Sequence, residues 1–136
     1  MNRLPGIISA VESVGSLALV DVEVGATRLA AMWVGVSDEF AQWAPGVSVT
    51  LLFKETEVAL GKNLSGLLSL RNRMACTVMD LEYGQLLARV GLRFGEHTLS
   101  AVITRRSALH LDLKVGDTVE ALVKANEMTI ATEGIQ

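Results

Sequence analysis

The segment LALVDVEVGATRLAAMWV, residues 17–34, recurs seventy positions later as LARVGLRFGEHTLSAVIT, residues 87–104. Val20 matches Val90, Gly25 matches Gly95 and Leu29 matches Leu99. At this offset the two halves of the chain align without a gap from residue 1 to residue 66. A repeat of this length indicates two tandem copies of one structural unit. We therefore divide the chain into residues 1–64 and 65–136, because the stretch 61–66 has the Gly, Lys, Asn and Ser composition of a linker.

Both copies have the pattern of β-strands. Apolar and polar residues alternate in residues 17–24 and 86–94, and Gly25 and Gly95 predict tight hairpin turns into 27–34 and 97–104. Further strands are predicted at 5–11, 74–81, 47–53, 118–124, 58–60 and 128–131. Four or five strands per unit predict an all-β fold made of two tandem OB-like small β-barrels.

One short helical turn is expected in each unit. The segments 37–43 and 107–113 begin with Ser37 and Ser107, which are favoured N-cap residues. Units of this size have marginal cores, so we expect the two to pack on each other and the chain to form homo-oligomers.

Composition limits the function. The chain has 136 residues, of which 50% are hydrophobic and 20% charged, as in a folded protein. Its net charge of −3 disfavours a general nucleic-acid binder. No apolar run approaches the roughly 20 residues of a membrane span, and no secretory signal is recognisable, so a cytoplasmic location without membrane contact is expected. The single cysteine, Cys76, lies in an apolar run and is expected to be a buried thiol.

The polar residues with the clearest chemistry are hydrogen-bond donors. Ser69-Leu70-Arg71-Asn72 supplies a hydroxyl, a guanidinium and a carboxamide without an acid. Thr104 to Ser107 joins a predicted strand to a predicted helical turn, where unpaired amides favour an anion, and Lys124-Ala125 ends another strand. A set of donors alone suits a dianion that carries no proton, such as sulfate, molybdate or tungstate. Alternatively, Thr104 and Ser107 only cap the turn and Lys124 is a solvated strand end.

Three motifs, Ser69-Leu70-Arg71-Asn72, Thr104-Arg105-Arg106-Ser107 and Val123-Lys124-Ala125, resemble the signatures of the molybdenum-pterin-binding domain family, also called Mop or TOBE domains. The tandem arrangement is similar to the di-Mop form found in molybdate-storage proteins and in the sensing domain of the molybdate-responsive repressor. The resemblance implies that molybdate or tungstate is the ligand.

The resemblance also implies a shared site. Ser69 and Arg71 would come from one unit and Thr104, Ser107 and Lys124 from a neighbouring unit or subunit, in a homotrimer or homodimer. The implied oxyanion-binding set is Ser69, Leu70, Arg71, Asn72, Thr104, Ser107, Lys124 and Ala125. In the first repeat Val34 stands where Thr104 does, so a weaker site with Ser37 and Lys54 is expected there.

The predicted function is binding of molybdate or tungstate for storage, buffering or sensing, without enzymatic activity. One alternative is the effector-sensing domain of a transcription factor or transporter ATPase, and another is an OB-fold that binds single-stranded nucleic acid. Ser107, His110 and Asp112 lie too close in sequence for a catalytic triad. His97 and His110 lack partners at metal-ligand spacing. Trp33 and Trp43 occur only in the first unit and are expected in the core.

Overall fold

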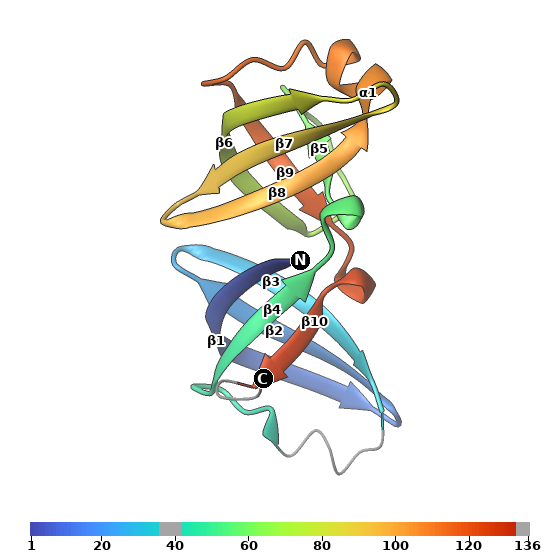
Figure 1. The fold of residues 1–136 in the computed structure, drawn as a ribbon. Helices are drawn as coiled ribbons and strands as arrows, with labels where there is room; N and C mark the ends of the chain where they lie inside the picture. The colour runs from blue at the N-terminus through green and yellow to red at the C-terminus, as the bar shows by residue number, and fades with distance from the viewer. Residues whose placement is uncertain (36–41, 133–136) are drawn as a thin grey trace.

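Two curled sheets, each of five antiparallel strands, lie one above the other in the computed structural model (Figure 1). The structure describes residues 1–35 and 42–132. The strand order is β10-β4-β1-β2-β3 in one sheet and β5-β9-β6-β7-β8 in the other. The predicted all-β fold of two OB-like barrels is confirmed.

The elements follow the sequence repeat. The first copy contains β1 (Asn2–Val14), β2 (Leu17–Val24), β3 (Thr27–Val34), β4 (Ser48–Phe53), the 3-10 turn η2 (Glu55–Glu57) and β5 (Ala59–Gly61). The second contains β6 (Asn72–Tyr83), β7 (Leu87–Phe94), β8 (His97–Thr104), α1 (Arg105–His110), β9 (Thr118–Val123), η3 (Ala125–Glu127) and β10 (Thr129–Thr132).

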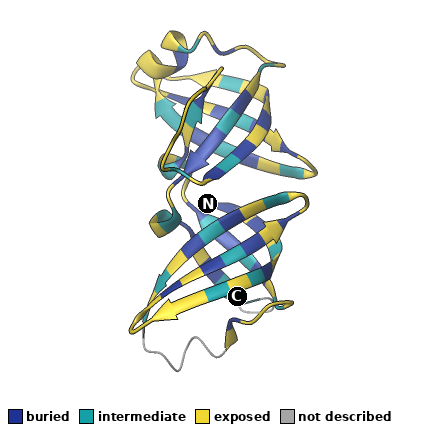
Figure 2. Cartoon of the chain, turned by 180° about the vertical axis from the view of Figure 1, so that it is seen from behind, coloured by how far each residue is buried: buried dark blue, intermediate teal, exposed yellow. Residues whose placement is uncertain are grey.

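Alternation along the strands creates the two cores. In β2, Ala18, Val20 and Val22 are buried, whereas Leu17 and Leu19 face outward. Figure 2 shows this alternation as changes of colour along the strands. Such a period of two places one face of each strand inside the barrel.

The predicted hairpin turns are present where the glycines stand. Val24 pairs with Thr27 and Phe94 pairs with His97, so each loop has two residues. Gly25 and Gly95 adopt φ angles of 60° and 59°, which an L-residue with a side chain rarely adopts. Glycine at the first loop position is typical of a type II′ turn, whose twist matches that of the flanking strands.

Each barrel contains one strand that belongs to the other repeat. β5 leaves the first repeat and pairs with β9, with Ala59 opposite Leu122. β10 leaves the second repeat and pairs with β4, with Thr129 opposite Leu52. Both sheets therefore contain residues from both repeats. The boundary between residues 64 and 65 remains a prediction, and it describes the sequence repeat.

Two buried asparagines connect the barrels. Asn72 at the start of β6 donates from Nδ2 to Ala30 O at 2.8 Å and accepts from Ala30 N at Oδ1 at 2.7 Å. Asn2 makes the equivalent pair of bonds with Ser100, both at 2.8 Å. Ala30 and Ser100 lie on β3 and β8, the edge strands of their sheets. Each carboxamide thus satisfies an edge backbone as a further strand would.

The linker between the repeats is tied to the second barrel. Lys62 Nζ donates to Leu111 O, Asp112 O and Asp117 Oδ2, at 3.0, 2.9 and 2.9 Å. The bond from Lys62, together with one from the Lys114 amide, lowers the pKa of Asp117 below its ordinary value. This attachment fixes the start of the segment that leads to Ser69.

The helical turn of the second repeat begins earlier than the sequence predicts. The helix α1 begins at Arg105 and its N-cap is Thr104, so the prediction that Ser107 begins it is wrong. Both residues are good caps by type, but Thr104 ends β8 in an extended conformation and its hydroxyl accepts from the Ser107 amide. Of the turn predicted at 37–43, residues 37–41 lie outside the described residues.

The core predictions are confirmed for Cys76 and Trp43, whereas Trp33 is half-buried against the core. Cys76 is 2% exposed, and Trp43 is buried with its ring in an edge-to-face contact with Trp33, at a centroid distance of 5.7 Å. Over the ranges that the structure describes, no helix has the length and apolar character needed to cross a membrane.

We expect Asn72→Ala to lower the free energy of unfolding by about 2 kcal/mol, because it removes two hydrogen bonds and leaves the Ala30 backbone unsatisfied. Urea denaturation followed by tryptophan fluorescence measures this. Asn126→Ala, which removes an exposed carboxamide, is the matched control and should change stability by less than about 0.5 kcal/mol. Equal stability of the two variants would contradict the role given to Asn72.

Burial raises the pKa of the Cys76 thiol from 9.0 to about 11. Between these values the unfolded chain loses the thiol proton while the folded chain keeps it, so stability falls as pH rises. The expected loss is about 2–3 kcal/mol between pH 9 and pH 11. Urea titrations across this range should show a shallower decline for Cys76→Ala, which lacks the group. A decline identical to that of the wild type would assign the loss to other groups.

Candidate functional site

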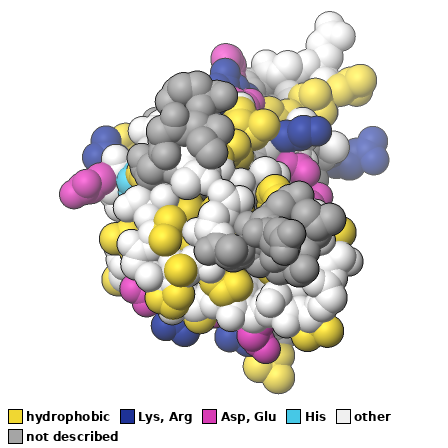
Figure 3. Space-filling view, turned by 90° about the horizontal axis from the view of Figure 1, so that it is seen from below, with side chains coloured by type: hydrophobic (Ala, Val, Ile, Leu, Met, Phe, Trp, Pro, Cys, Tyr) yellow, Lys and Arg dark blue, Asp and Glu magenta, His cyan; other side chains and the backbone are white. Residues whose placement is uncertain are grey.

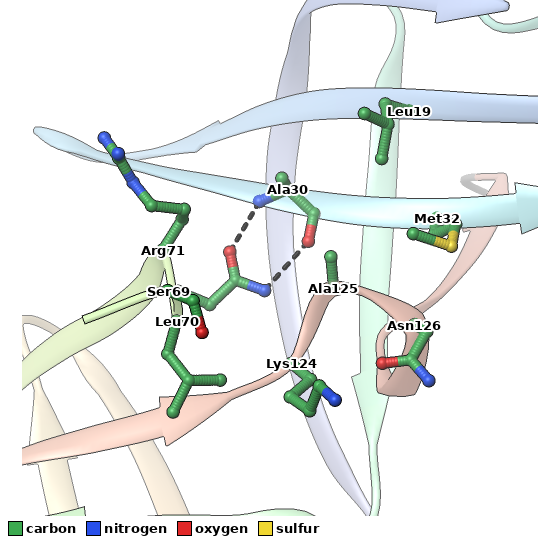
Figure 4. Close-up of a pocket in the computed structure, with 10 residues that line it drawn as sticks. Leu19, Ala30, Met32, Ser69, Leu70, Arg71, Lys124, Ala125 and Asn126 are labelled. Carbon is green, nitrogen blue, oxygen red and sulfur yellow. Dashed lines mark hydrogen bonds between the residues drawn. The ribbon is translucent and has the colours of Figure 1, made fainter.

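A pocket lies at the junction of the two barrels, where the linker enters β6 and β9 leaves for η3. Its volume is about 290 Å³, at the small end of the range for ligand sites. Residues from both repeats line it, as Figure 4 shows: Leu19, Ala30, Met32, Ser69, Leu70, Arg71, Asn72, Lys124, Ala125 and Asn126.

The charge in this pocket is positive. Arg71 and Lys124 are its charged lining residues, and none of the described residues that line it is acidic. Neither cation forms an ion pair with another described residue, whereas Arg73 binds Glu120 at 2.7 Å and Lys62 binds Asp117 at 2.9 Å. Both cations are exposed, and Figure 4 shows the Arg71 guanidinium pointing away from Lys124. The two side chains are free to turn toward a bound anion.

The backbone holds these residues near one another. Asn72 anchors the start of β6 to Ala30, and Ser69 and Arg71 directly precede it. Lys124 directly follows β9 in an extended conformation and is the N-cap of η3. The first amides of such a turn have no partner within it, so the turn adds donors beside the Lys124 ammonium.

One wall of the pocket is apolar. Leu19 and Met32 lie opposite each other on β2 and β3, and the half-buried Leu70 also lines the pocket. An apolar wall lowers the local dielectric, which strengthens the interaction of an ion with nearby charges.

Of the sequence-predicted residues, six line this pocket and two do not. The six are Ser69, Leu70, Arg71, Asn72, Lys124 and Ala125. Thr104 lies at the start of α1, which Figure 1 places at the outer end of the second barrel, and Ser107 lies within α1. The resemblance groups Lys124 with Thr104 and Ser107, but within one chain Lys124 lies with Ser69 and Arg71.

Thr104 and Ser107 are bonded to each other. Thr104 Oγ1 donates to Ser107 Oγ at 2.7 Å and accepts from Ser107 N at 3.0 Å. The capping interpretation therefore describes these residues in the single chain. Thr104, but not Ser107, lines a separate pocket of about 500 Å³ that includes Leu86, Leu87 and Leu109.

Asn72 has a structural role that could not be inferred from the sequence. Asn72 is 1% exposed, and its carboxamide forms hydrogen bonds to the Ala30 backbone through both its oxygen and its nitrogen. Asn72 thus lines the pocket while its oxygen is already occupied. Its place in the anion shell stays a prediction.

Sequence reasoning missed four lining residues. Leu19, Ala30 and Met32 come from the outer face of the β2–β3 hairpin, and Asn126 from η3. Apolar side chains on an exposed strand face look like ordinary surface residues. The only signal was the unusual run of outward apolar residues in this hairpin.

The other candidate constellations gain no support. Among the described residues, no group of three or more His, Cys, Asp or Glu side chains could hold a metal ion. His97 packs against Phe94 at a ring distance of 6.5 Å. Of the two residues predicted for a weaker first-repeat site, Ser37 is outside the described residues, and Lys54 is exposed at the N-cap of η2.

Fold and site together define a tandem-barrel protein with a small cationic pocket between its barrels. The family model of the TOBE domain matches residues 1–60 and again residues 68–130. The chain belongs to the TOBE domain family, in two tandem copies, and the predicted resemblance is confirmed.

Several known proteins are similar. Molybdenum-pterin-binding protein MopB of Rhodobacter capsulatus is 34% identical over 109 residues, which is 79% of this chain and 40% of MopB. Molybdenum import ATP-binding protein ModC of Brucella abortus (strain 2308) is 35% identical over 123 residues, or 90% of this chain and 32% of ModC. The chain therefore spans less than half the length of either relative.

A solved structure has the same two-barrel architecture. It is that of the cytoplasmic molybdate-binding protein ModG with molybdate bound, and it matches with a TM-score of 0.89 at 29% identity. The match covers 96% of this chain and 95% of the ModG chain.

Thr104→Val keeps the shape of the side chain but removes the cap, and we expect it to lower the free energy of unfolding by about 1 kcal/mol. Thr98→Val on the same strand, at an exposed position, is the control and should be nearly neutral. Both are measured by urea denaturation. If the two variants were equally stable, the Thr104 hydroxyl would contribute nothing to α1.

Proposed function

We propose that the chain binds molybdate or tungstate as an intact oxyanion in the pocket formed by Ser69, Arg71 and Lys124. The observation that carries this proposal is the donor set itself: two cations that pair with no described carboxylate, in a pocket without a described acidic residue. A dianion supplies the negative charge that this arrangement lacks.

The donor types suit a tetrahedral oxyanion. The Arg71 guanidinium can donate two parallel hydrogen bonds, Lys124 supplies an ammonium and Ser69 a short hydroxyl. Each unit charge at 4 Å contributes about 4 kcal/mol at an effective dielectric constant of about 20, before desolvation is subtracted. Hydrogen phosphate brings a proton that needs an acceptor, so a donor-only pocket favours molybdate and tungstate over it.

The relatives support this ligand. ModG is a cytoplasmic molybdate-binding protein, and MopB and ModC are named for molybdenum-pterin binding and molybdenum import. On this support we propose a cytoplasmic binding protein for storage, buffering or sensing rather than an enzyme.

The site is completed by a second copy of the chain. Beside the pocket, the outward face of β2 and β3 exposes four apolar side chains, Leu17, Leu19, Met32 and Val34. Around Thr104, another exposed apolar surface contains Leu86, Leu87 and Leu109. Docking the second surface of one chain on the first surface of the next would bring Thr104 and Ser107 toward the pocket. Contacts between unlike surfaces are heterologous and form a ring when the rotation closes, so this docking fits a trimer and not an isologous dimer.

The nucleic-acid alternative finds no favourable feature. Trp33 and Trp43 pack against each other instead of presenting a stacking platform. On the face seen in Figure 3, both Lys or Arg and Asp or Glu side chains lie along the edge of the molecule. A mixed surface of this kind attracts phosphate backbones weakly.

Arg71→Ala and Lys124→Ala are each expected to weaken molybdate binding by about 1.5–3 kcal/mol, which is roughly 10- to 150-fold in Kd. The reason is the loss of one charge-assisted hydrogen bond to the dianion. Isothermal titration with molybdate measures the change, with sulfate and phosphate as competing anions and light scattering to follow the mass of the assembly.

The matched controls are Arg28→Ala and Lys114→Ala, whose side chains are exposed and lie outside the pocket. Both should bind molybdate with the wild-type Kd. If the pocket variants bound as tightly as these controls, the proposed site would be wrong, and if the wild type bound no oxyanion the proposed function would be wrong.

A further inference from the structure

The sequence repeat generates a second pocket at the barrel junction. At the repeat offset of seventy residues, Asn2 corresponds to Asn72, Ala30 to Ser100 and Leu19 to Arg89. η3 packs against β3 in one pocket and η2 packs against β8 in the other. This second pocket has a volume of about 470 Å³ and is lined by Met1, Asn2, Glu55, Asp80, Glu82, Arg89, Gly91, Thr98, Leu99 and Ser100.

The two related pockets have opposite charge. Glu55 is the first residue of η2, at the position that Ala125 occupies in η3. Asp80 and Glu82 add two further carboxylates to the lining, against the single guanidinium of Arg89. Even when the Met1 amino group is counted, three negative groups face two positive ones.

The arginine of the second pocket is already engaged. Arg89 Nη2 lies 3.4 Å from Glu55 Oε1, and Arg89 Nε donates to Ser100 Oγ at 2.9 Å. The Glu55 side chain is 29% exposed, so its charge is partly shielded from water. The Glu55 carboxylate already balances the charge of the Arg89 guanidinium. An entering dianion would therefore be repelled by the carboxylate without a free positive charge to attract it.

We propose that Glu55 closes the second pocket to oxyanions, so that the residue at the first position of the 3-10 turn selects which of the two related pockets admits a dianion. Ala125 leaves the turn open and uncharged, whereas Glu55 fills the same position with negative charge. This inference rests on the proposed function, and it predicts one inter-barrel anion per chain where the repeat alone predicts two.

Crystals soaked in tungstate test the two pockets separately, because tungsten gives a strong anomalous signal. We expect an anomalous peak in the pocket of Arg71 and Lys124 and none in the pocket of Glu55. Peaks of similar height in both pockets would overturn the inference while supporting the proposed function. Absence of tungstate from both pockets would contradict the proposed function and remove the inference with it.

Two substitutions separate charge from size in solution. Ala125→Glu reproduces the Glu55 position in the cationic pocket, and Ala125→Gln adds a side chain of the same size without charge. In molybdate titrations of variants with wild-type circular dichroism, Ala125→Glu should have a Kd at least tenfold higher than Ala125→Gln. Equal Kd values for the two variants would show that charge at this position does not select the anion. The tungstate crystals decide the question if Ala125→Glu does not fold.

Discussion

The hydrogen bonds between two buried asparagines and two edge strands hold the molecule in its present form. Asn72 and Asn2 each offer one donor and one acceptor, spaced like the backbone groups of a neighbouring strand, to Ala30 and Ser100. An unpaired edge in this position would leave backbone groups buried without partners, which costs more than the bonds themselves contribute. The asparagines therefore fix the relative position of the barrels. Because Ser69 and Arg71 directly precede Asn72, they also fix the position of the cationic pocket.

The repeat supplies geometry, and single residues supply chemistry. Both junction pockets are built from an asparagine, an edge strand and a 3-10 turn, and yet one contains two cations that pair with no described carboxylate and the other contains three carboxylates. This separation explains how a duplicated unit can acquire unlike sites without a change of fold. A side chain at the start of a short turn alters the local charge, while the hydrogen bonds that define the backbone stay the same.

The strands could be predicted from the sequence because alternation, hairpin glycines and the repeat agree with one another. β2, β3, β7 and β8 follow closely from the pattern, and so does the burial of Cys76. Two features could not be predicted. β5 and β10 occupy equivalent places in the repeat, so each could equally pair with its own sheet or with the other one. Thr104 and Ser107 are both favourable N-caps, and only the register of β8 with β7 decides that Thr104 ends the strand. Ser69, Arg71 and Lys124 were selected from the sequence by residue type and line one pocket, whereas the apolar wall of that pocket depends on packing between units.

The exchange of β5 and β10 also dictates the order in which the molecule can assemble. The first barrel is completed by Thr129–Thr132, so its fifth strand is synthesised after every other strand of the protein. Pairs such as Leu52 with Thr129 have a long sequence separation, and topologies rich in such pairs fold slowly. Neither half is complete without the other, and the chain is equivalent to a strand-swapped dimer whose two protomers are joined by a linker. Its unfolding should therefore be a single cooperative event, and cutting the linker should leave two fragments that reassociate.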